Sequence, residues 1–288
     1  MMRTCGVLAV FGVVLMIGCA APGPPSWPIC PGKADVEQAL SALAGQAEKA
    51  TSFRATGECL LTWHAPDSGK QKKNHLPVKL WFDPPSQVYI QGSIALDAKA
   101  VIIGSNEDRF WLALRPKEMS SYYTGRWEET RTVEGLMMSP KVVLEAFGIV
   151  VQAEEPGADR WTLTNEGPFD ILTLRDAEGR PVKRVSVYAC DYTVYKIEYF
   201  DGEGNAVGIA ELRDYESVVD GFRVPTHITV TAVGPEGRND SMDIEISAMS
   251  MKVIPFSDRL KELIFTAPDT GRFEHVYTYR NGRWVAER

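Results

Sequence analysis

The chain has 288 residues, and its 31 Lys and Arg against 38 Asp and Glu give a formal net charge of −7. This length is enough for one large β domain or two small ones. The basic residues form no cluster along this mildly acidic chain, so the sequence argues against nucleic-acid binding and against electrostatic docking on anionic lipid.

The N-terminus has the pattern of a secretory signal peptide, with Arg3 followed by an apolar run over residues 6–17. This run is shorter than the roughly 20 apolar residues of a transmembrane helix. It ends in Met-Ile-Gly-Cys at residues 16–19, which resembles a bacterial lipobox except that Met replaces the consensus Leu. We therefore expect a leader over residues 1–18 and a lipid-anchored Cys19. The alternative is an ordinary signal peptide cleaved near Ala21.

A proline-rich stretch follows, with five prolines between residues 20 and 33. Such a segment cannot form a helix, and it predicts a stiff tether over residues 19–33 ahead of a single body over residues 34–288. Three cysteines remain beyond the lipid site, Cys30, Cys59 and Cys190. An exported compartment permits a disulfide, but an odd number leaves one thiol unpaired and the pairing open.

Two segments have helical periodicity. Asp35 can cap the first helix, with Gln38 as its capping-box partner, and apolar residues recur at helical spacing over residues 36–53. Ser139 followed by proline begins the second, whose apolar side extends over residues 140–150.

Elsewhere the apolar pattern has a period of two, interrupted by short turns, which indicates antiparallel strands. Residues 67–74 are polar and turn-like, and Ser257 begins a short helical turn. The predicted fold is mainly β, a single curved antiparallel sheet forming an unclosed half-barrel, with helices on the concave face. The predicted strands are residues 54–64, 76–82, 87–93, 99–103, 109–114, 160–165, 169–175, 182–189, 194–200, 207–214, 222–232, 242–253, 274–280 and 283–286.

Several strands of the first half place bulky apolar residues on both faces, whereas the strands of the second half alternate with polar residues. The first half therefore needs partners on both sides. Two helices are few for so long a sheet, so part of the concave face is expected to receive a ligand. The alternative is a fully packed interior. The candidates for lining an apolar cavity are Leu80, Trp81, Phe82, Tyr89, Ile90, Phe110, Trp111, Leu112 and Phe147.

Four segments in this order resemble the LolA/LolB superfamily of lipoprotein carriers and receptors. They are Ala-Thr-Ser-Phe at residues 50–53, Leu-Trp-Phe-Asp-Pro-Pro at 80–85, the strand–turn–strand of residues 102–116, and Leu-Ile-Phe-Thr-Ala-Pro at 263–268. The resemblance covers roughly residues 34–268. It implies an unclosed antiparallel barrel capped by helices, whose apolar cavity receives the acyl chains of lipoproteins.

The lipobox makes the chain more similar to the membrane-anchored receptor of that superfamily than to its soluble carrier. Two features depart from the pattern. The carrier has a basic pair where this chain has Asp83 and Pro84, so the arginine that aids lipid release has no counterpart. The receptor's exposed leucine, which aids membrane insertion, has a plausible but unassigned counterpart in the loop over residues 94–96.

Residues for catalysis are not apparent. No G-x-S-x-G motif occurs, and the Gly-x-Gly at residues 202–204 lies in a charged turn. Asp240, Asp243 and Glu245 alternate along a strand, and residues 154–155 are a Glu pair in a loop, so both sets are interpreted as solvated surface. The four histidines are scattered. No cofactor, metal site or enzymatic activity is expected.

The resulting hypothesis is a bacterial lipoprotein, held by its N-terminal lipid at the outer membrane and facing the periplasm, that binds acyl chains of lipids or lipoproteins. The preference for the outer membrane comes from Ala20, because an aspartate after the lipid site signals inner-membrane retention in enteric bacteria. The second hypothesis is a non-catalytic envelope interaction or sensor module that docks a protein partner.

Overall fold

The structure, a computed structural model, describes residues 27–64, 68–94, 97–115, 120–127, 145, 158–234, 237–280 and 283–288. Several sequence predictions lie outside these residues. They are the signal peptide, the lipid site Cys19, the second helix over residues 140–150 apart from Glu145, the cavity candidate Phe147 and the Glu pair at residues 154–155.

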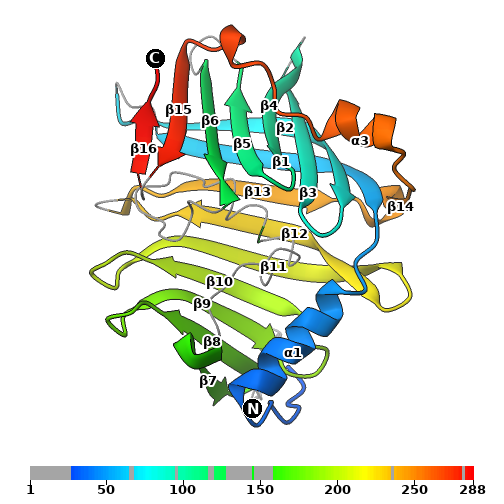
Figure 1. The fold of residues 1–288 in the computed structure, drawn as a ribbon, viewed down its shortest axis with the longest axis vertical. Helices are drawn as coiled ribbons and strands as arrows, with labels where there is room; N and C mark the ends of the chain where they lie inside the picture. The colour runs from blue at the N-terminus through cyan, green and yellow to red at the C-terminus, as the bar shows by residue number, and fades with distance from the viewer. Residues whose placement is uncertain are drawn as a thin grey trace, which may run out of the picture.

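Within the described part, sixteen strands form one large sheet that does not close into a barrel (Figure 1). Its order is β16-β15-β6-β5-β4-β3-β2-β1-β13-β12-β11-β10-β9-β8-β7, with β14 paired to β1, so β16 and β7 are the free edges. Neighbouring strands are antiparallel except β15 and β6, which are parallel. A mainly β fold with a single unclosed sheet is thereby confirmed.

In the first half of the chain, the strands are β1 (Phe53–His64), β2 (Gln71–Asp83), β3 (Gln87–Ile94), β4 (Asp97–Ser105), β5 (Arg109–Leu114) and β6 (Ser121–Arg126). In the second half, they are β7 (Trp161–Glu166), β8 (Phe169–Arg175), β9 (Pro181–Tyr188), β10 (Val194–Phe200), β11 (Ala206–Val219), β12 (Phe222–Ala232), β13 (Asp240–Ile246), β14 (Lys252–Val253), β15 (His275–Arg280) and β16 (Arg283–Ala286).

Alternation along the strands gives the sheet two faces of different character. On β1, Phe53, Ala55, Cys59 and Leu61 are buried on one face, whereas Arg54 is exposed on the other. Successive side chains of a strand point to opposite faces, so this pattern assigns every odd position of β1 to the core. The larger of the two apolar clusters of the core extends over this face along the whole sheet.

The helix α1 (Val36–Ala47) covers one end of that same face, near β7 and β8 (Figure 1). Asp35 caps it as predicted, because the Asp35 side chain accepts a hydrogen bond from the backbone N–H of Gln38 at 2.8 Å. Ala39 and Leu43 are its buried residues. The predicted helix was too long, since α1 ends at Ala47 and Phe53 already begins β1.

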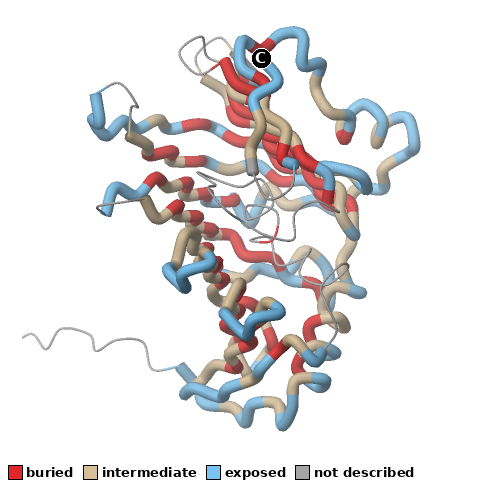
Figure 2. The backbone as a smooth tube through the Cα atoms, turned by 60° about the vertical axis from the view of Figure 1, so that its left-hand side comes forward, coloured by how far each residue is buried: buried red, intermediate tan, exposed pale blue. Residues whose placement is uncertain are grey.

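The opposite face of the first half is covered by the C-terminal part of the chain. A second cluster packs Phe265, Phe273 and Val276 against Tyr89, Ile102, Trp111, Ala113 and Tyr122 of β3 to β6. The short helix α3 (Asp258–Ile264) and the 3-10 turn η5 (Thr270–Arg272) belong to this covering segment. The first half is therefore packed on both sides, as its apolar strands predicted, and Figure 2 shows buried residues concentrated along the strands.

The described part of the predicted tether packs against the sheet. Trp27 contacts the rings of Phe169 and Tyr188, with ring centroids 5.8 and 5.1 Å apart. The backbone N–H of Lys33 donates a hydrogen bond to Asp170 at 2.9 Å. Residues 27–33 are thus packed against the folded body.

Candidate functional site

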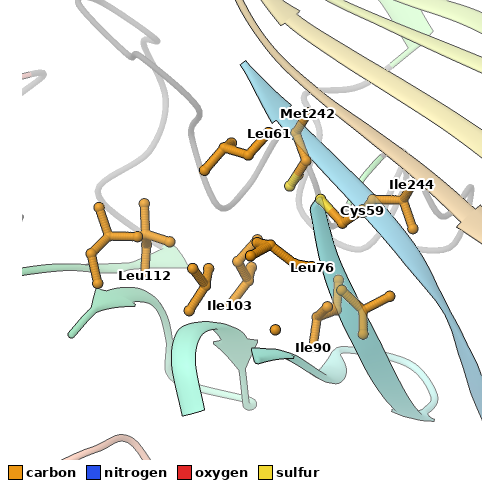
Figure 3. A pocket seen from close by; sticks show the side chains of 12 residues that line it. Cys59, Leu61, Leu76, Ile90, Ile103, Leu112, Met242 and Ile244 are labelled. Atoms are coloured by element: carbon orange, nitrogen blue, oxygen red, sulfur yellow. The ribbon is translucent and has the colours of Figure 1, made fainter. Parts of the chain in front are cut away.

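An apolar hollow lies on the α1-bearing face of the sheet, where β1 to β5 and β13 meet (Figure 3). Figure 3 shows side chains from these strands directed toward a common space. Every lining residue is apolar or a glycine or cysteine, and none carries a charge or a hydroxyl group. The lining residues are Cys59, Leu61, Leu76, Val78, Ile90, Gly92, Val101, Ile103, Leu112, Leu114, Met242 and Ile244.

The hollow exists because the sheet is strongly curved here. Leu112 on β5 and Ile244 on β13 line the same space, although five strand-to-strand steps separate their strands. On a flat sheet, five steps span about 24 Å. This face is therefore the concave one, and curvature brings together side chains that are distant along the sheet.

The hollow is narrow. About 20 Å³ of it is open to the centre of a water molecule, which is room for about one water. The whole space, including its opening to solvent, is about 510 Å³. The interior is thus neither an empty barrel nor a solid core, and a long ligand can enter only if side chains or strands move apart.

Of the eight predicted cavity residues that the structure describes, two line the hollow. Ile90 and Leu112 do so from β3 and β5. Leu80, Phe82 and Phe110 belong to the same concave cluster but pack around the hollow rather than lining it.

Three predicted cavity residues lie on the outer face instead. Tyr89 and Trp111 are buried in the second cluster, with Trp81 packed against it. These assignments are corrected by strand alternation, because each neighbours a concave-face residue and must point the other way. The ring of Trp111 packs against Gly104, which lies opposite it on β4. A Cβ on Gly104 would lie 2.5 Å from this ring, so the position requires glycine.

Most of the true lining was missed. Cys59, Leu61 and Leu76 come from β1 and β2, and Met242 and Ile244 come from β13. None of these residues was among the candidates. Only the pairing of β1 with β13 places Met242 and Ile244 beside Leu61 and Cys59.

Burial controls the chemistry of the single thiol in this lining. Cys59 is the free cysteine among the described residues and is 3 % exposed. Burial, with a smaller contribution from Asp243, raises the pKa of the Cys59 thiol from 9.0 to about 12. It therefore stays protonated at neutral pH and behaves as a small apolar group rather than as a nucleophile.

A buried polar cluster lies farther along the concave face. The Nζ of Lys183 on β9 is 3.2 Å from a carboxylate oxygen of Glu145, and the hydroxyl of Tyr199 on β10 donates to that same carboxylate. All three residues are buried. Their charges and hydrogen bonds are mutually satisfied, so the cluster fixes Glu145 against the sheet.

Two of the three acidic residues interpreted as solvated surface pair with histidines, and one of them, Asp240, is buried rather than solvated. Asp240 lies 2.9 Å from Nδ1 of His64, and Asp243 lies 2.9 Å from Nε2 of His227. No group of three or more His, Cys, Asp or Glu among the described residues is arranged to hold a metal ion. In the same part of the chain, no helix is both long and apolar enough to span a membrane.

Comparison with solved structures identifies the fold. A domain assigned as an outer membrane lipoprotein-sorting protein from Vibrio parahaemolyticus matches with a TM-score of 0.52 at 11% identity, covering 81% of this chain and 98% of that one. A DUF1329 family protein from Desulfovibrio piger matches with a TM-score of 0.51 at 13% identity, covering 81% and 100%. A LolA superfamily protein from Nitrosomonas europaea gives 0.49 at 14% identity, covering 82% and 99%. The fold is LolA/LolB-like.

At these identities, the likeness establishes the LolA/LolB-like fold and does not assign an activity. No protein-family model matches the sequence, and no curated protein matches it significantly.

One departure from the LolA/LolB-like pattern has a structural explanation. Asp83, which stands where the soluble carrier has a basic residue, is buried at the end of β2. It accepts a hydrogen bond from the Ser52 hydroxyl and pairs with Lys261 of α3 at 2.6 Å. Asp83 thereby ties α3 to the sheet, and its hydrogen bond raises the pKa of Lys261.

Proposed function

We propose that this protein is a lipid-anchored envelope protein that binds acyl chains of lipids or lipoproteins in the concave hollow. The observation that carries the proposal is the lining of the hollow, because six strands converge on it without contributing one charged or hydroxyl side chain. A cavity lined by polar groups would hold water, whereas a cavity lined by apolar groups favours hydrocarbon.

Binding in such a site needs no bond cleavage. Each methylene group removed from water contributes about 0.8 kcal/mol in the ideal limit. A bilayer offers the chain an equally apolar environment, so transfer in either direction is close to balanced. The proposed role is accordingly non-catalytic, and no cofactor takes part.

The narrowness of the hollow determines how loading occurs. Because the sheet has two free edges at β7 and β16, its halves are not locked together by a closed hydrogen-bonded ring. We infer that an acyl chain separates the lining of β1 and β13 from that of β3 to β5 as it enters. Loading is then limited by this opening rather than by diffusion.

The proposed location is the outer membrane, with the body facing the periplasm and Cys19 carrying the lipid. The lipobox-like residues 16–19 support it. A disulfide between Cys30 and Cys190 also supports an exported protein, because such bonds persist in oxidising compartments.

The test is mass spectrometry of lipids that copurify with the protein expressed in bacteria. Gly92 lines the hollow, and a Cβ there would lie 3.4 Å from Leu76, so the side chain of Gly92→Val takes up space inside the hollow. Gly208 on β11 is the matched control, because its Cβ would lie 3.6 Å from Tyr199 and away from the hollow. Lipid in the wild-type protein and the Gly208→Val variant, but not in Gly92→Val, is expected.

The second candidate is a non-catalytic envelope interaction or sensor module that docks a protein partner. The observation that favours it is the small free volume of about 20 Å³. In that case, no lipid copurifies with any of the three proteins, and added fatty acid leaves their stability unchanged.

A further inference from the structure

The outer face of the sheet carries a groove that the sequence did not predict. It lies beside β1 and β2, next to the 3-10 turn η4 (Ala248–Ser250) and β14, and has a volume of about 390 Å³. Three of its eight lining residues are basic, and the set contains no acidic residue. The lining residues are Arg54, Ala55, Thr56, Lys79, Trp81, Met249, Ser250 and Lys252.

Strand register brings the three cations together from distant parts of the sequence. Arg54 on β1 lies directly opposite Lys252 on β14. On the other side of β1, Lys79 of β2 is opposite Thr56, two residues from Arg54. Like charges opposite each other on paired strands are destabilising. Among the described residues, none of the three cations forms an ion pair that offsets this repulsion.

The local charge is opposite to that of the chain, whose formal net charge is −7. Glu58 and Glu245 lie opposite each other farther along β1 and β13, and they bound the basic region on that side. A repulsive basic cluster within an acidic protein is suited to an anion that neutralises all three side chains at once.

The groove also contains an exposed apolar side chain. Met249 is 94% exposed and lines the groove together with Lys252. The hydroxyl of Ser250 accepts a hydrogen bond at 2.8 Å from the backbone N–H of Thr56, which holds η4 against β1. Met249 is therefore presented beside the cations by a fixed turn.

Cations next to an exposed apolar side chain match the interface of an anionic bilayer, where phosphates lie beside the first methylene groups. A free phosphate ion would use the cations but gain nothing from Met249. We propose that this outer groove binds the phosphate groups of anionic phospholipids and docks the outer face of β1 and β2 on a membrane surface. This revises the expectation that the chain lacks electrostatic affinity for lipid.

The proposal is independent of the acyl-chain hollow, because the groove and the hollow lie on opposite faces of β1 and β2. It also does not require the N-terminal lipid. All of the groove's lining residues lie between Arg54 and Lys252. The chain from Trp27 onward therefore contains the whole groove and is the form to test.

The experiment measures binding of this protein to vesicles of phosphatidylglycerol and phosphatidylcholine by co-sedimentation. The test variant is Arg54→Gln/Lys79→Gln/Lys252→Gln. The matched control is Lys70→Gln/Lys72→Gln/Lys73→Gln, which removes the same charge from exposed residues at the other end of β2. We expect the test variant to lose about 100-fold in affinity and the control to lose much less. Raising the salt concentration should weaken wild-type binding.

Three further arms separate the possible outcomes. Vesicles of phosphatidylcholine alone should bind weakly, and Met249→Ser should weaken binding to the anionic vesicles. Inorganic phosphate followed by chemical shifts of Lys and Arg side chains tests the other source of the anion. Saturation by phosphate without vesicle binding, or equal binding by the two triple variants, would overturn membrane docking. Copurified lipid in the hollow should be the same in all of these variants, so either proposal can fail alone.

Discussion

A disulfide joins Cys30, in the segment before α1, to Cys190, in the turn between β9 and β10, with their Cα atoms 5.0 Å apart. It links positions 160 residues apart in sequence. Together with the contacts of Trp27 and Lys33, it fixes the start of the body against the far end of the sheet from the hollow. The described part of the chain therefore begins beside β7 to β10.

Removing this disulfide should lower the free energy of unfolding. The loop it closes is long, so the loss of chain-entropy stabilisation in Cys30→Ala/Cys190→Ala is about 5 kcal/mol at most. Urea unfolding followed by circular dichroism measures this loss of stability. The fluorescence of Trp27 should change at a lower urea concentration than the circular dichroism signal of the sheet. Unchanged stability would show that the segment is held by its aromatic contacts alone.

Lys183 and Glu145 should show strong coupling in a double-mutant cycle. Lys183→Met leaves a buried carboxylate without its cation and should cost about 3 to 5 kcal/mol. Replacing both, with Lys183→Met and Glu145→Leu, should recover most of that loss because no buried charge remains unpaired. If the stability losses of the two single variants simply add in the double variant, the two side chains are not desolvated in solution.

Stability should fall at high pH because of Cys59. The folded state holds the thiol proton up to a pKa of about 12, whereas the unfolded chain releases it near the ordinary value of 9.0. Between these values the unfolded state binds fewer protons, so deprotonation favours unfolding by about 1.4 kcal/mol per pH unit. Below pH 9 the thiol is protonated in both states, so Cys59 does not make the free energy of unfolding depend on pH. Thermal melts from pH 8 to 11 should show a steeper decline for wild type than for Cys59→Val, and parallel declines would contradict the buried thiol.

Two glycines of adjacent strands should respond oppositely to alanine. At Gly104, a Cβ would lie 2.5 Å from the fully buried ring of Trp111, so Gly104→Ala should destabilise by about 2 kcal/mol or more. At Gly92, a Cβ meets only ordinary contacts in the hollow, so Gly92→Ala should be neutral or stabilise by about 0.5 to 1 kcal/mol. Melting temperatures of the two variants measure the difference, and the reverse order would place the hollow elsewhere.

Local patterns predicted most of the strands. The ranges for Arg109–Leu114, Phe169–Arg175, Val194–Phe200 and Phe222–Ala232 match the structure because clear alternation is bounded by turn residues. Residues 71–74 were assigned to a turn, yet they extend β2, because pairing with β1 continues beyond the apolar residues. The strand β6 was missed, since its tyrosines are covered by contacts with β5, with β15 and with the covering segment at Phe273.

Contacts between distant strands could not be read from the sequence. The predicted single strand over residues 242–253 ends at Ile246, and η4 turns the chain so that β14 returns to pair with the start of β1. That turn creates the outer groove and places Lys252 beside Arg54. Aromatic residues such as Trp111 were named as cavity candidates because their strands carry bulky apolar residues on both faces, whereas alternation decides the face on which each one lies.

The most direct test of the acyl-chain hollow is photo-crosslinking with palmitic acid that carries a diazirine at its terminal end. The wild-type protein is irradiated with this probe, digested and mapped by mass spectrometry. The account predicts crosslinks in peptides from β1 to β5 and β13, competed away by unlabelled palmitate and lost in Gly92→Val. Crosslinks confined to the outer groove, or none above the background of an unrelated protein, would contradict it.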